Sequence, residues 1–186
     1  MPVDALLASG RSHPWFRKLT ALGFQPATGI RMTAAAVTPM AVGQAIGLTE
    51  AGVLVGVGGL FVSFLDSGGA YRQRARVMLW AALAIALSGA FGVLAASHGI
   101  WAGIALFGIA FSTGLCGAFG AVAESASLFV LIAFIVSQNS PGNASDAMLR
   151  FAGLATGGIW ATLVSLMLWP LRPYGPQMDA VAECYR

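Results

Sequence analysis

Of the 186 residues, 58% are hydrophobic and only 9% are charged, whereas about a quarter of the residues of a soluble domain are charged. The chain therefore lacks the polar surface of a soluble protein, and we expect an all-α integral membrane protein. The formal net charge of +3 is too small to indicate a nucleic-acid partner. The 24 glycines fit the same class, because small residues let helices approach closely in lipid.

The sequence offers no arrangement of residues typical of catalysis. The histidines are His13 and His98, and neither a Walker loop nor a metal-spaced set of histidines and cysteines occurs. Cys116 and Cys184 lack the spacing of a zinc, haem or redox site. We therefore predict no enzyme activity, no metal site and no cofactor.

Residues 1–28 are polar and mixed, which predicts a cytoplasmic N-terminal segment. Its acidic start and short apolar run predict no cleaved signal peptide. Six apolar stretches follow, most of them close to the roughly 20 helical residues that cross about 30 Å of hydrocarbon. The six predicted transmembrane helices, which together make a module over residues 29–171, are 29–48, 51–65, 77–96, 100–115, 121–137 and 149–169.

Two of these predicted spans carry small-residue faces. Gly52 and Gly56 are four residues apart in the second span, and Gly153 and Gly157 are four apart in the sixth. This spacing predicts close helix packing. The second span is also short, so we expect it to be thin or partly broken, and Pro39 should kink the first span.

The polar stretch between the second and third spans contains an acid, a glycine pair, a tyrosine and three arginines. We predict that Asp66 caps the third helix, where a carboxylate accepts backbone N–H bonds. Arg72, Arg74 and Arg76 spread around a helix because of their spacing, so most are expected to anchor to lipid head groups. Tyr71 and Arg72 are predicted, with Asp66, to make a structural or gating contact.

The basic residues orient the module. With six spans, both termini lie on one side, and placing that side in the cytoplasm leaves Arg150 as the single outer residue among the ten lysines and arginines. After the sixth span, prolines end the helix, and residues 172–186 contain a short amphipathic pattern. A helix of that length is not stable alone, which predicts the start of a truncated cytoplasmic helical domain.

Several short motifs resemble one known family. Arg31 opens the first span, a glycine-rich second span runs into Asp66-Ser-Gly-Gly-Ala-Tyr71-Arg72, and the sixth ends at Leu168-Trp169-Pro170-Leu171-Arg172-Pro173-Tyr174. Together they are similar to the N-terminal module of the fusaric acid resistance and aromatic acid exporter proteins. The resemblance extends from about residue 29 to residue 186.

The resemblance implies a multi-pass efflux protein of the bacterial inner membrane that exports aromatic carboxylic acids or similar organic anions. It also implies six-helix membrane modules that alternate with cytoplasmic helical domains, and a periplasmic adaptor protein as partner. Plant malate channels are distant relatives of that family, so a passive anion channel remains an alternative. A third reading is a non-transporting scaffold whose glycine faces assemble a homo-oligomer.

An aromatic carboxylate needs a cation for its charge and apolar walls for its ring. Arg31 is the predicted cation, with Gln44 and Glu124 as further substrate-binding residues in the apolar spans. Glu124 is also the candidate for proton coupling, because a carboxylate in an apolar span is costly and usually functional. The alternatives are that Arg31 extends to head groups and that Glu124 lies at the cytoplasmic interface.

Overall fold

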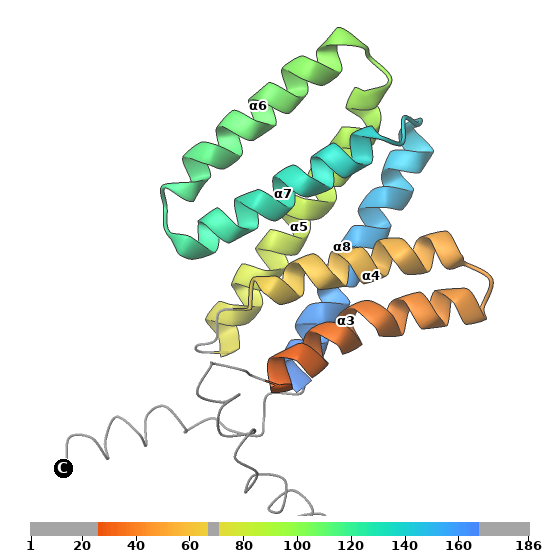
Figure 1. Ribbon diagram of the computed structural model, residues 1–186, viewed down its shortest axis with the longest axis vertical. Helices are drawn as coiled ribbons and strands as arrows, with labels where there is room; N and C mark the ends of the chain where they lie inside the picture. Colours follow the sequence, from red (N-terminus) through yellow and green to blue (C-terminus); the bar gives the residue numbers. More distant parts are fainter. Residues whose placement is uncertain (1–25, 67–70, 168–186) are drawn as a thin grey trace, which may run out of the picture. The chain divides into compact units, whose positions relative to one another are not determined.

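The computed structural model describes residues 26–66 and 71–167 (Figure 1). The predicted N-terminal segment and the predicted cytoplasmic domain at 172–186 lie outside these residues, apart from the start of the first helix. The chain divides into two units, residues 1–30 and residues 31–186. The packing below concerns the second unit.

The described residues form six α-helices and no strand, which confirms the all-α class. In chain order the helices are α3 (Pro26–Ala45), α4 (Thr49–Phe64), α5 (Tyr71–Ala96), α6 (Ile100–Gly117), α7 (Ala121–Gln138) and α8 (Ala144–Met167). Each predicted span falls on one of them. Pro39 lies inside α3, which is continuous across it.

Four of the described helices, α5 to α8, are long and apolar enough to cross a membrane. The helix α4 is apolar but has 16 residues, which corresponds to about 24 Å at 1.5 Å per residue. This agrees with the expectation of a short second span. The helices and their composition support a multi-pass membrane protein.

Short connections join consecutive helices. The turns before α4, α6 and α7 each contain a glycine with positive φ, at Gly47 (77°), Gly99 (53°) and Gly120 (123°), a conformation that residues with a side chain rarely adopt. The last helix begins at residue 144, five residues before the predicted span. Asn143 donates its backbone N–H to Asp146 Oδ2 at 3.0 Å, and this capping contact starts the helix early.

The helices do not pack in chain order. Glycines of α4 contact α3 on one side and α8 on the other, α8 also packs on α5, and α5 packs on α7. The helix α6 packs on α7, where Gln138 Nε2 donates to the carbonyl of Ala102 at 3.0 Å. The order of neighbours is therefore α3, α4, α8, α5, α7, α6, so the last described helix lies between α4 and α5 (Figure 1).

The predicted glycine faces are confirmed. A Cβ on Gly52 would lie 2.9 Å from the Cα of Gly43 in α3, and one on Gly58 would lie 2.5 Å from the carbonyl oxygen of Leu154 in α8. A Cβ on Gly157 would likewise collide with the backbone of α4 at Val55. The backbones of α3, α4 and α8 can approach this closely because these positions have no side chain.

The buried core lies where α3, α4, α5, α7 and α8 meet, and includes Val62, Met78, Ile85 and Phe134. The helix α6, which is last in the order of neighbours, has no buried residue. Many of its apolar side chains are exposed, among them Trp101 with 65% of its surface exposed. Such an apolar surface is unsuited to water and suited to lipid.

Candidate functional site

A buried cluster of charges lies where α3, α4, α5 and α8 meet. Arg31 Nη1 of α3 lies 2.6 Å from Asp66 Oδ2, and Arg74 of α5 also forms an ion pair with the Asp66 carboxylate. Ser165 of α8 donates its hydroxyl to Asp66 Oδ2 at 3.1 Å. The side chains of Arg31, Asp66 and Arg74 are 8%, 1% and 1% exposed. One carboxylate therefore connects four segments of the chain.

The sequence places Arg74 in this cluster through the periodicity of α5. Arg74, Met78, Ala81 and Ile85 recur at helical spacing, and all four are buried, so they form the inner face of the helix. Arg72 is exposed, as is Arg76 one turn further on. The spread of the three arginines around the helix is as predicted, but the residue in contact with Asp66 is Arg74.

Arg31 is the candidate cation for an organic anion, and only part of its guanidinium has a partner. Its Nη1 is paired with Asp66, whereas its Nε is buried and makes no hydrogen bond within the described part of the chain. A buried guanidinium nitrogen without a partner is costly, since an unmade hydrogen bond carries its full desolvation penalty. Arg31 therefore presents an unused donor beside its ion pair.

The structure brings Arg31 and Asp66 together, but it does not join them to the other predicted site residues. Gln44 is exposed near the far end of α3, about 20 Å from Arg31 along the helix at 1.5 Å per residue. Tyr71 begins α5, and its side chain lies outside the described part. The described contacts of the Asp66 carboxylate go to two guanidiniums and a hydroxyl.

Glu124 lines a different space. It is exposed in the first turn of α7 and borders a cavity of about 570 Å³ between α6 and α7. Thr113, Ser127 and Leu128 also line it. Neither hydroxyl is available as a donor, because each bonds a carbonyl of its own helix. Glu124 is the charged residue of this cavity, and Arg31 does not border it.

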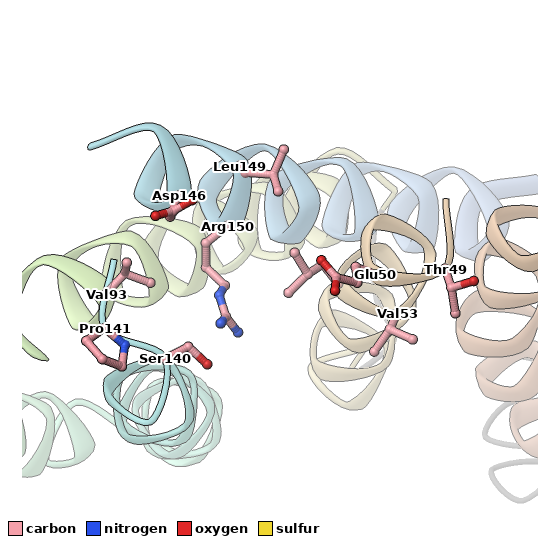
Figure 2. A pocket seen from close by; sticks show the side chains of 10 residues that line it. Thr49, Glu50, Val53, Val93, Ser140, Pro141, Asp146, Leu149 and Arg150 are labelled. Atoms are coloured by element: carbon pink, nitrogen blue, oxygen red, sulfur yellow. The ribbon is translucent and has the colours of Figure 1, made fainter. Parts of the chain in front are cut away.

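A second polar region, which the sequence analysis did not single out, lies at the opposite ends of α4, α5 and α8. A cavity of about 480 Å³ is bordered there by Glu50 of α4, Val93 of α5, Ser140 after α7, and Arg150 of α8. Figure 2 shows the Arg150 guanidinium extending from α8 into this space and the Glu50 carboxylate facing it from α4. The sequence indicated this region only through Arg150, the single basic residue predicted on the outer side.

The two polar regions are separated by most of the thickness of a membrane. From Arg74 to Val93 along α5 is about 28 Å at 1.5 Å per residue, close to the roughly 30 Å of a bilayer core. From Arg150 to Ser165 along α8 is about 22 Å. The charge cluster and the 480 Å³ cavity therefore occupy opposite ends of the same helices.

Comparisons with known proteins give two relatives. The chain is 30% identical over 188 residues to the uncharacterized membrane protein YvaC of Bacillus subtilis (strain 168), a match that covers the whole chain and 28% of that protein. It is 28% identical over 158 residues to the uncharacterized protein slr1298 of Synechocystis sp., which covers 84% of the chain and 20% of that protein. The chain thus spans less than a third of the length of each.

No family model matches the chain, and no solved structure matches it. The name of the first relative and the four long apolar helices support a membrane protein with several spans.

Proposed function

We propose that this chain is the membrane module of a transporter that exports aromatic carboxylic acids or similar organic anions across a bacterial inner membrane. The proposal includes six spans with both termini in the cytoplasm, membership of the aromatic acid exporter family, and assembly with a second copy and a periplasmic adaptor. It rests on the resemblance of the motifs around Arg31, Asp66 and Trp169, and on the charge cluster.

The observation that carries the proposal is the buried ion pair of Arg31 with Asp66. Charged side chains within membrane helices are rare, pair with one another, and mark the paths of ions and substrates. Arg31 keeps one buried donor, its Nε, without a hydrogen bond in the described residues. A planar guanidinium with a free edge is suited to a second carboxylate.

In the proposed cycle, a substrate carboxylate binds the guanidinium of Arg31 and replaces Asp66 as its partner. The two guanidiniums and one carboxylate of the cluster sum to a formal charge of +1, which the bound substrate carboxylate brings to zero. Loss of the Arg31 contact loosens Asp66, which also holds α5 and α8 through Arg74 and Ser165. Glu124, in its own cavity between α6 and α7, carries the coupled proton.

Flux through reconstituted vesicles tests the proposal. Vesicles containing the purified chain are loaded with radiolabelled benzoate, and efflux is followed with and without a pH gradient. We expect proton-dependent flux, a loss of flux in Arg31→Gln, and loss of proton dependence alone in Glu124→Gln. Arg76→Gln is the matched control, because Arg76 is an exposed arginine on α5.

The other outcomes decide between the alternatives. Flux that follows only the benzoate gradient indicates a passive channel, and no flux from a monodisperse sample indicates a scaffold. If Arg31→Gln and Glu124→Gln both leave flux unchanged, the proposed site is wrong. Size-exclusion chromatography of each variant separates loss of transport from loss of folding.

A further inference from the structure

The 480 Å³ cavity at the ends of α4, α5 and α8 has no part in the proposed transport site. Its volume is within the range of small-molecule pockets. Glu50 and Arg150, which carry opposite charges, reach into it from different helices (Figure 2). These charges indicate what the cavity binds, whether or not the chain transports an anion.

The two charges do not neutralise each other. Within the part of the chain that the structure describes, neither Glu50 nor Arg150 forms an ion pair or a side-chain hydrogen bond. The other acid of the cavity, Asp146, accepts the backbone N–H of Asn143 through Oδ2 at the start of α8. The Glu50 carboxylate and the Arg150 guanidinium thus border the cavity from α4 and α8 without a partner among the described residues.

The rest of the lining is mostly apolar. Val53 and Leu54 of α4, Val93 of α5 and Leu149 of α8 also border the cavity. A ligand with only one charge would leave the opposite group unpaired in this space, which costs free energy when water is displaced. A ligand that carries both charges on an apolar body satisfies both.

We propose that this cavity binds a zwitterion, with its ammonium group at Glu50, its anionic group at Arg150, and its apolar part against the apolar lining. The cavity lies at the ends of helices long enough to cross a membrane. The zwitterion therefore has two sources: the head group of a lipid such as phosphatidylethanolamine, or a free amino acid with an apolar side chain.

Binding by the unmodified chain provides the first test. The chain is placed in nanodiscs of phosphatidylglycerol, and L-phenylalanine is titrated against 3-phenylpropionate, which lacks the ammonium, and phenethylamine, which lacks the carboxylate. In parallel, native mass spectrometry measures lipid retained from an equal mixture of phosphatidylethanolamine and phosphatidylglycerol. Either preferential retention of phosphatidylethanolamine or tighter binding of phenylalanine than of both analogues supports the site and identifies the source.

Substitutions then locate the binding. Loss of a charge-assisted hydrogen bond lowers affinity by about tenfold or more, so Glu50→Gln and Arg150→Gln should each abolish the preference for the zwitterion. Glu50→Asp and Arg150→Lys keep the charges and should retain it. The control is Arg76→Gln, which removes a positive charge near the start of α5, about 26 Å along the helix from Val93.

The proposal is overturned if the one-charge analogues bind as tightly as phenylalanine and the lipids are retained equally. It is also overturned if both Gln variants, shown by size-exclusion chromatography to be folded, keep the preference of the original chain. Because the analogue series uses the unmodified chain, the proposal remains testable even if a variant does not fold. A failure of benzoate flux in vesicles has no bearing on this result.

Discussion

The close contact between α4 and α8 can be tested by adding one methyl group. In Gly58→Ala, the new Cβ would lie 2.5 Å from the carbonyl oxygen and 2.8 Å from the Cα of Leu154. Ordinary van der Waals contact begins at 3.4 Å, so the shortfall is about 0.9 Å. Both obstructing atoms belong to the backbone, so α8 must move as a unit. If they belonged to a flexible side chain, a change of rotamer would be enough.

The expected cost follows from two opposing effects. Overpacking of a well-packed interior costs about 1–3 kcal/mol, whereas replacing a helical glycine by alanine gains about 0.5–1 kcal/mol in backbone entropy. The matched control is Gly103→Ala on α6, where a new Cβ meets nothing within 4 Å. The control measures the entropy gain alone, so the difference between the two variants isolates the packing cost.

Thermal unfolding of the two variants in detergent, followed by tryptophan fluorescence, provides the measurement. For a chain of this size, 1 kcal/mol shifts Tm by about 2–4 °C, so Gly58→Ala should melt about 2–12 °C below Gly103→Ala. Equal melting temperatures would show that α4 and α8 do not pack through Gly58 in the folded protein. The arrangement of α8 between α4 and α5 would then be wrong.

Four further variants test the charge cluster and the start of α8. Asp66→Asn removes the carboxylate that two buried guanidiniums share and should lower the free energy of unfolding by about 3–5 kcal/mol. Arg74→Gln should lower Tm clearly and Arg72→Gln hardly, since only the first is buried; the reverse order would assign the contact to Arg72. Asp146→Ala removes the acceptor for the Asn143 N–H and should lower the free energy of unfolding by about 0.5–1 kcal/mol. Circular dichroism should show this as a partial loss of helix on mild heating.

The helices could be predicted from the sequence because a helix that crosses lipid needs mainly sufficient length and hydrophobicity. Apolar runs bounded by glycine turns gave the six helices, and paired glycines gave the faces of α4 and α8. The start of α8 was missed by five residues because Ser145 and Asp146 are polar and do not resemble a membrane span. The Asn143–Asp146 contact, which starts the helix, was not singled out in the sequence.

The pairing of residues across helices was harder to predict. Arg31 and Asp66 were recognised as candidates for separate reasons, and their contact depends on the packing of α3 against the end of α4. Arg74 was grouped with the head-group anchors, although its register with Met78 and Ile85 marks it as inward-facing. The cavity of Glu50 and Arg150 joins residues 100 positions apart, so chain order alone gives no sign of it.

The position of α8 gives the two polar regions a physical connection. Ser165, near one end of α8, bonds Asp66 of the charge cluster, and Arg150, near the other end, lines the 480 Å³ cavity. Between them α8 packs on α4 through backbone atoms at Gly58 and Gly157, which leaves little room for a displacement there. A shift of α8 along α4 must therefore alter both regions together. Because α8 follows all the other described helices in the chain, the Asp66 cluster is complete only after this helix has packed.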